Sequence, residues 1–156
     1  MEQSEYKYLA GCEEILPGDL SYKDNRALVL HFLYLADSYG YDVDFKDLIE
    51  KFSDDFNINI SQNQDILHDT LSMIQSRDEI DQKILPFLSN WRFERIGAIT
   101  KLILRIGIWD LEHSKFDKIG IINGCIELAK CFSEKDAYKF VNGILDEYAK
   151  THNLKS

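Results

Sequence analysis

Apolar residues recur along most of the chain at the three- and four-residue spacing of an α-helix. The stretch from Trp91 to Leu111 carries two neighbouring apolar stripes, formed by Ile96, Ile99, Ile103 and Ile106 and by Ala98, Leu102 and Trp109. A helix that is apolar over most of its circumference has to be covered on several sides. We therefore expect this stretch to be the central helix of a domain. Gly97 and Gly107 would each cost about 1 kcal/mol against alanine inside a helix, so we expect a neighbouring helix to approach closely at both.

The first half of the chain predicts a second helix that is apolar almost all round, over residues 21–38. Ser21 followed by Asp24 resembles a capping box, in which a side-chain oxygen accepts from a free backbone N–H of the first turn. Gly40 is expected to end this helix.

Shorter helices are expected between residues 44 and 88. Asp44 with Asp47 starts a one-sided amphipathic helix that carries Phe45, Leu48, Ile49, Phe52 and Phe56. Ser61 with Gln64 caps a helix whose apolar face holds Ile66 or Leu67, Thr70, Leu71 and Ile74. A last apolar set, Ile80, Ile84 and Leu88, should be kinked or stopped at Pro86.

Two more helices are predicted after the central one. The stretch 117–132 places on one face Ile119, Ile122, Ile126 and Ala129. Ser133 with Asp136 forms a capping box for a last helix that buries Ala137, Val141, Ile144, Leu145 and Tyr148. Asn123-Gly124 and Asn142-Gly143 would normally indicate hairpins, but both lie inside helical periodicity.

These patterns predict an all-α protein of about seven helices, with no convincing strand and no internal repeat. Residues 1–20 show no sustained period and contain Pro17-Gly18. We interpret them as an N-terminal extension with one short helical turn over Tyr8 to Ile15, followed by a helical domain over residues 21–152.

Composition places the chain among globular proteins. It has 156 residues, of which 45% are hydrophobic. No run of eighteen apolar residues is present, so no membrane span is expected. The acidic start lacks the apolar core of a signal peptide. Three cysteines, at Cys12, Cys125 and Cys131, have no CxxC spacing, which is typical of reduced thiols in a cytoplasmic protein.

The net charge of −9 argues against a protein dedicated to nucleic-acid binding. The charge is unevenly distributed, because residues 1–60 hold 5 basic and 13 acidic side chains, whereas residues 91–156 hold 11 and 9. A locally positive surface is therefore compatible with the second half of the chain, although the overall charge predicts weak binding of RNA without help.

The sequence carries no pattern typical of an enzyme. His31, His68, His113 and His152 are scattered, with no HExxH motif, and no phosphate-binding glycine loop or GxSxG motif is present. We therefore expect no catalytic residues, no bound metal and no cofactor.

Three blocks in the last third of the chain resemble the NusB family of bacterial transcription antitermination factors. They are ILRIGIWDL (Ile103–Leu111), INGCIELAKCF (Ile122–Phe132) and KFVNGILD (Lys139–Asp146), in the family's order and at its spacing. RALVLHFLY (Arg26–Tyr34) adds a weaker match, and the resemblance extends over roughly residues 22–150.

The resemblance implies a fold of two small helical bundles packed together and a non-catalytic function. Together with the small-subunit ribosomal protein NusE, such a factor holds a boxA-type single-stranded RNA within the transcription elongation complex. RNA polymerase thereby becomes resistant to termination while it makes ribosomal RNA. The family includes both monomers and homodimers, and the sequence does not choose between them.

The resemblance also implies site residues. The RNA-binding positions would be Lys23, Arg26, Lys130, Lys135, Lys139 and Phe140. The NusE-binding positions would be Tyr34, Glu94 and Lys101. Each position has an ordinary structural alternative, since lysines often only solvate a helix and Phe140 could belong to the core. Arg105 is expected to be the structural partner of an acid rather than an RNA contact.

The chain departs from the family where the family usually has an arginine-rich run. Residues 22–26, YKDNR, hold only two positive charges, and each lost phosphate contact lowers the salt dependence of RNA binding. An alternative interpretation is therefore a protein-interaction scaffold of the same fold, with weakened or lost RNA binding, whose acidic half binds a basic partner. A helical domain of the kind attached to ribosomal-RNA cytosine methyltransferases is a third interpretation, which would need a separate catalytic subunit.

Overall fold

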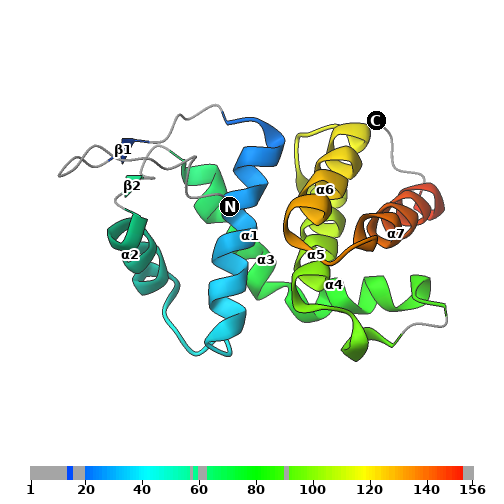
Figure 1. The fold of residues 1–156 in the computed structure, drawn as a ribbon, viewed down its shortest axis with the longest axis horizontal. Helices are drawn as coiled ribbons and strands as arrows, with labels where there is room; N and C mark the ends of the chain where they lie inside the picture. Colours follow the sequence, from blue (N-terminus) through cyan, green and yellow to red (C-terminus); the bar gives the residue numbers. More distant parts are fainter. Residues whose placement is uncertain (1–13, 16–19, 57, 60–62, 90–91, 153–156) are drawn as a thin grey trace. The chain divides into compact units, whose positions relative to one another are not determined.

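A computed structural model describes residues 14–15, 20–56, 58–59, 63–89 and 92–152. This part of the chain contains seven α-helices (Figure 1), which confirms the predicted all-α class. They are α1 (Tyr22–Ser38), α2 (Phe45–Phe56), α3 (Gln64–Gln75), α4 (Arg77–Ile84), α5 (Ala98–His113), α6 (Lys118–Phe132) and α7 (Ala137–Thr151). Two 3-10 turns, η2 (Leu85–Phe87) and η3 (Phe93–Arg95), lie between α4 and α5. No described helix has both the length and the apolar content to cross a membrane.

The chain divides into two compact units, residues 1–72 and residues 73–156. The core of unit 1 brings together α1 and α2. The ring of Phe52 meets Phe32 edge-on at 4.6 Å between centroids and His31 at 5.1 Å. A short parallel pair joins β1 (Glu14–Ile15) to β2 (Ile58–Asn59). The helical turn predicted over Tyr8 to Ile15 lies outside the described residues except at its last two, which are strand.

The predicted starts of the first two helices are confirmed. The Ser21 hydroxyl accepts a hydrogen bond from the Asp24 backbone N–H at 3.2 Å, which caps α1. An Asp44 carboxylate oxygen accepts from the Lys46 N–H at 2.8 Å before α2. Gly40 follows α1 with a φ of +64°, a conformation that glycine adopts without strain. The capping role predicted for Ser61 lies outside the described residues.

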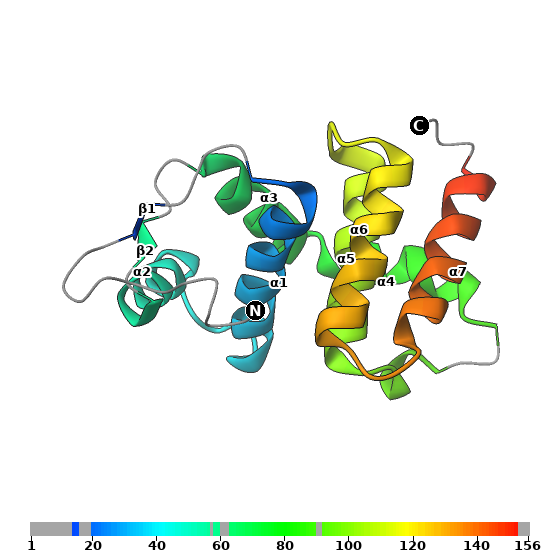
Figure 2. The same cartoon turned by 45° about the horizontal axis from the view of Figure 1, so that its top comes forward.

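Unit 2 is built around α5, as its apolar circumference predicts (Figure 2). Helices α4, α6 and α7 all pack against it, and its fully buried residues include Ile103, Leu104, Ile106 and Ile108. A Cβ on Gly107 would lie 2.6 Å from a methyl of Leu145. The expected close approach of a neighbouring helix at Gly107 is therefore confirmed, and that helix is α7.

The central helix begins later than predicted, at Ala98 instead of Trp91. Residues 93–95 form a 3-10 turn, Ile96 is extended, and Gly97 occupies the N-cap position. The expectation that Gly97 lies inside a helix is therefore wrong. Gly97 still makes room for a neighbour, because a Cβ there would lie 2.8 Å from a carboxylate oxygen of Glu134.

The capping box predicted for Ser133 and Asp136 is also wrong. Ser133 ends α6, and its hydroxyl is hydrogen-bonded to the hydroxyl of Thr100. Asp136 precedes α7 in the left-handed conformation, with a φ of 68° and no side-chain cap. The hydroxyl that should have capped α7 is bonded to α5 instead.

The buried faces of α3 and α6 differ from the predicted ones. In α6, Ile119 is 58% exposed, and the buried side chains are Ile121, Ile122, Cys125, Leu128 and Ala129. In α3, Met73 is buried and Leu71 is exposed, whereas Ile66 and Thr70 are buried as expected. Both helices carry more apolar residues than one face can hold, so packing against their neighbours selects the face. The apolar residues expected in α4 and α7 are buried as predicted, and Pro86 lies in the turn that ends α4.

Candidate nucleic-acid interface

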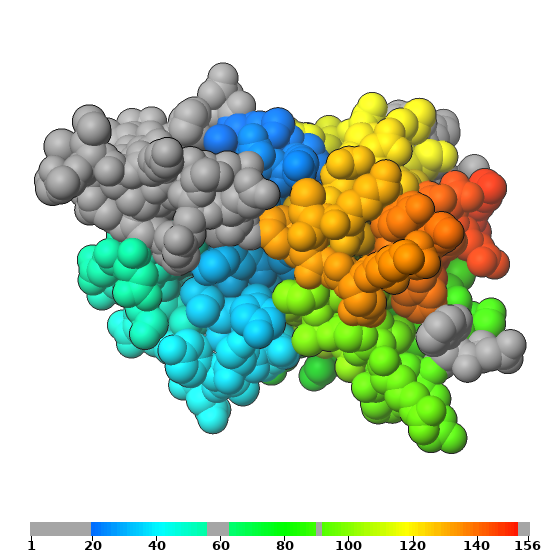
Figure 3. All heavy atoms as spheres, in the orientation of Figure 1, coloured from blue at the N-terminus to red at the C-terminus, as the bar shows by residue number. Residues whose placement is uncertain are grey.

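The turn between α6 and α7 collects three of the lysines singled out from the sequence. Lys130 lies in the last turn of α6, Lys135 in the connection, and Lys139 in the first turn of α7. Asp136 reverses the chain by its left-handed backbone, so the two helix ends lie side by side on one face of unit 2 (Figure 3). All three lysines are exposed. We call Lys130, Lys135, Lys139 and Tyr138 the basic corner.

Tyr138 connects two of these lysines. The Lys130 Nζ lies 5.0 Å from the centroid of the Tyr138 ring, and the Lys139 Nζ lies 5.9 Å from it. Both distances are in the range of cation–π attraction. Tyr138 was not among the residues predicted from the sequence, where its only signal is an aromatic residue beside Lys139 and outside the apolar stripe of α7.

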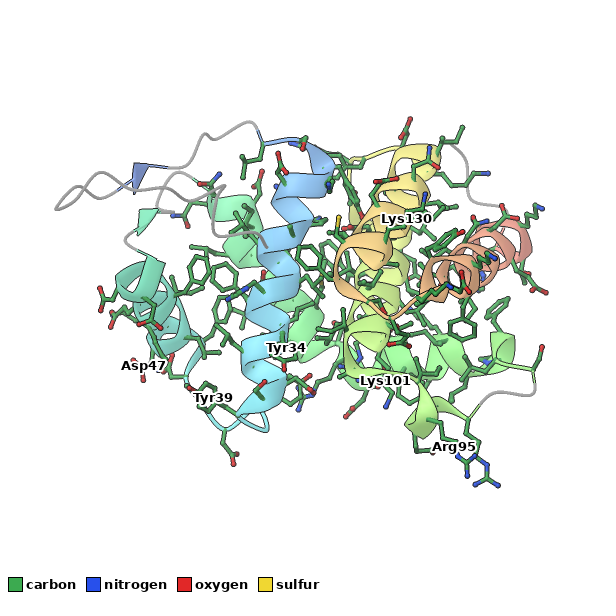
Figure 4. The ribbon with its side chains drawn as sticks, in the orientation of Figure 1. Tyr34, Tyr39, Asp47, Arg95, Lys101 and Lys130 are labelled. Carbon is green, nitrogen blue, oxygen red and sulfur yellow. The ribbon has the colours of Figure 1, made fainter. Side chains whose placement is uncertain are left out.

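A half-open pocket of about 520 Å³ lies beside the basic corner. Its apolar wall is made by Ile96, Ala137 and Phe140, and the side chains of Arg95, Lys135 and Lys139 also line it. Phe140 is only partly buried, so its ring contributes to this wall as well as to the packing of α7. Figure 4 shows Arg95 in the turn η3 before α5, and Lys130 on α6.

Acidic side chains reduce the positive charge of this region. Glu134, held near Gly97, accepts a long hydrogen bond from Thr100 at 3.5 Å and lines the pocket with Asp136. Lys130 lies 3.8 Å from Glu127 on α6, and Lys139 lies 3.7 Å from Asp136. Such exposed pairs contribute roughly 0–1 kcal/mol and exchange readily. The lysines therefore remain accessible to a stronger anionic partner.

Arg26 occupies a different environment from the one implied by the resemblance. Its side chain is buried, it donates to an Asp69 carboxylate oxygen at 2.8 Å, and it donates to Asn25 at 2.8 Å. The guanidinium also lies 5.8 Å from the centroid of the Tyr22 ring. This arginine joins α1 to α3 inside unit 1, and its buried side chain is not part of the basic corner. Lys23, in the first turn of α1, is exposed.

The positions implied for a protein partner are accessible in part. Tyr34 projects from α1 of unit 1 and is 45% exposed (Figure 4). In unit 2, Glu94 is exposed on η3. Lys101 is half-buried, with its Nζ 4.8 Å from the centroid of the Phe93 ring.

Arg105 has the structural role expected from the sequence. Its guanidinium makes two hydrogen bonds of 2.7 Å to the two carboxylate oxygens of Asp81, which joins α5 to α4. Among the described residues, no group of three or more His, Cys, Asp or Glu side chains could hold a metal ion.

The fold and this surface define an all-α protein with an exposed basic corner at one helix–helix turn. The chain belongs to the NusB family, whose model matches residues 23–150. A transcription antitermination protein NusB from a Nitratiruptor species is 34% identical over 116 residues, which cover 72% of this chain and 83% of that protein. The protein of the same name from Macrococcus caseolyticus is 38% identical over 90 residues, covering 56% of this chain and 69% of that protein.

Solved structures show the same likeness. The NusB of T. maritima matches with a TM-score of 0.73 and 25% identity over 85% of this chain and 92% of that one. A chain in the structure described as "Crystal Structure of a Plectonemic RNA Supercoil" matches with a TM-score of 0.72 and 25% identity, over 86% of this chain and 97% of that one.

Proposed function

We propose that this chain is an antitermination factor that binds a boxA-type single-stranded RNA jointly with NusE, without catalysing a reaction. The observation that carries the proposal is the basic corner with its adjoining pocket. Lysine ammonium groups neutralise phosphates, and an aromatic or apolar wall accepts an unpaired base. Both kinds of group meet here, where the turn between α6 and α7 lies beside the residues that precede α5, on a protein of acidic net charge.

The acidic overall charge explains why a protein partner would be needed. A chain of net charge −9 repels RNA at long range, and three lysines offer few phosphate contacts. A basic ribosomal protein bound at the same time would supply the missing positive surface. For that partner we propose contacts at Tyr34, Glu94 and Lys101.

Fluorescence anisotropy with a labelled boxA-like RNA, with and without NusE, tests this function. We expect weak binding by the chain alone and tighter binding when NusE is present. Equal, salt-insensitive affinity for any RNA under both conditions would contradict the proposal. Recovery of a basic protein other than NusE from lysate, together with no RNA binding, would favour the scaffold alternative.

A pair of charge reversals tests the proposed surface. Lys135→Glu with Lys139→Glu should abolish measurable RNA binding, because two phosphate contacts become repulsive, while the thermal unfolding temperature stays nearly unchanged. The matched control is Lys115→Glu with Lys118→Glu, which changes the net charge equally at the other end of α6. A 15-residue helix separates the two pairs by about 22 Å. Unchanged RNA binding in the first variant, or an equal loss in both variants, would show that the basic corner is not the RNA-binding site.

A further inference from the structure

The ring of Tyr138 lies close to the ammonium groups of two lysines that belong to different helices. Lys130 ends α6 and Lys139 begins α7, and their ammonium groups lie 5.0 and 5.9 Å from the ring centroid. The Lys130 and Lys139 side chains are 49% and 66% exposed, and Tyr138 itself is partly exposed. Burial of apolar surface therefore accounts for little of this arrangement.

The two like charges would otherwise move apart. Each also has an acidic neighbour of its own that can hold it elsewhere: Glu127, one turn back on α6, lies 3.8 Å from Lys130, and Asp136, before α7, lies 3.7 Å from Lys139. Free lysine side chains also have high conformational entropy, which is lost when they bind a phosphate. The negative face of an aromatic ring offsets both effects, because it attracts each ammonium group without neutralising it.

We propose that Tyr138 is a positioning residue for RNA binding, which holds the Lys130 and Lys139 ammonium groups together as a site for the phosphates of a single-stranded RNA. This inference rests on the function proposed above and adds a residue and a role to it. Tyr138 acts through the two lysines, and its ring need not touch a base.

The role predicts that the aromatic ring matters and the hydroxyl does not. Tyr138→Phe should bind RNA within about twofold of the unsubstituted chain, because the ring is retained. Tyr138→Leu should bind roughly five- to thirty-fold more weakly, since both lysines lose their attraction to the ring. The slope of log affinity against log salt should also become less negative, by up to about 1.4. Each phosphate contact with a single strand contributes about −0.7 to this slope, and two contacts would be weakened.

The experiment compares these variants by anisotropy under the condition in which the unsubstituted chain binds RNA, with urea unfolding of each variant beside it. Tyr39→Leu is the matched control, because Tyr39 is an exposed tyrosine that follows α1 in unit 1. Tyr138→Leu is then repeated in a chain with Lys130→Gln and Lys139→Gln. In that background the substitution should have no further effect, because Tyr138 acts only through the lysines.

Three outcomes overturn the inference. If the salt slope of Tyr138→Leu is unchanged while the unsubstituted chain still binds RNA, the role of Tyr138 is overturned and the proposed function is not. A further loss of affinity in the Lys130→Gln, Lys139→Gln background assigns direct base stacking to Tyr138 instead. A chain that binds no RNA in any condition overturns the proposed function as well, so the two failures are distinguishable.

Discussion

Two glycines on facing helices illustrate how differently the same residue type behaves. Gly107 faces the fully buried side chain of Leu145, and a Cβ there would lie 2.6 Å from one of its methyl groups. Gly143 lies on α7 with nothing within 4 Å of the position of a Cβ. The first glycine therefore permits close packing of α5 against α7, and the second contributes only backbone entropy to the unfolded state.

Gly107→Ala should destabilise the protein by about 1–3 kcal/mol, because the added methyl overpacks the contact with Leu145. Gly143→Ala should instead stabilise it by up to about 1 kcal/mol, since alanine favours an exposed helix position. Urea unfolding measures both changes. Equal effects of the two substitutions would show that the α5–α7 contact is looser than the structure indicates.

At the scale of elements, one polar network joins three helices of unit 2. Glu112 on α5 accepts from the Lys83 ammonium of α4 at 2.6 Å and from the hydroxyl of Tyr148 on α7. Burial by itself raises the pKa of Glu112, but the hydrogen bonds from Lys83 and Tyr148 and the charge of Lys83 outweigh it, so the pKa lies below its ordinary value. The hydrogen bond to Glu112 raises the pKa of Lys83 despite partial burial.

This network predicts how stability depends on pH. A carboxyl group whose pKa is lowered by folding stabilises the native state above the ordinary value of 4.5, and loses that contribution as the pH falls through the lowered pKa. Glu112→Gln should therefore reduce the free energy of unfolding near neutral pH and flatten its decline in acid.

Urea unfolding between about pH 7 and pH 3 checks this prediction. Glu147→Gln, an exposed change on α7, is the control and should leave the acid decline unaltered. A decline as steep in Glu112→Gln as in the unsubstituted chain would exclude Glu112 as a cause of the acid sensitivity.

At the scale of the whole molecule, charge is separated along the chain. The first 60 residues carry 13 acidic and 5 basic side chains, and the basic corner lies in the last third. Repulsion by the acidic part is long-ranged and screened by salt, whereas contacts of lysine with phosphate are local. The proposed RNA binding therefore depends on a few direct contacts and little on steering by the protein as a whole.

This separation predicts a shallow salt dependence. Three phosphate contacts from the basic corner give a slope of about −2 for log affinity against log salt. Anisotropy with the boxA-like RNA at several salt concentrations measures it, first without NusE and then with it, where a steeper slope is expected. A slope near zero without NusE would exclude the three lysines as phosphate contacts.

Much of the fold could be predicted because its signals are local. Ser21 and Asp44 cap helices through atoms two or three residues away. The apolar circumference of α5 follows from residues within one stretch, and so does its central place in unit 2. The resemblance in the last third of the chain pointed to the family, which the match over residues 23–150 then showed.

What only the tertiary structure decided depends on residues far apart in sequence. Ser133 was expected to cap α7 and is bonded to Thr100, 33 positions earlier, and the guanidinium of Arg26 is paired with Asp69, 43 positions later. Tyr138 meets Lys130 because the chain turns back between α6 and α7, where Asp136 has a left-handed backbone. Helical periodicity and capping are set by neighbours along the chain, so the sequence alone determines them. Which face of a helix is buried, and which polar groups pair, is set by packing in three dimensions. Neither can be predicted from the residues adjacent in sequence.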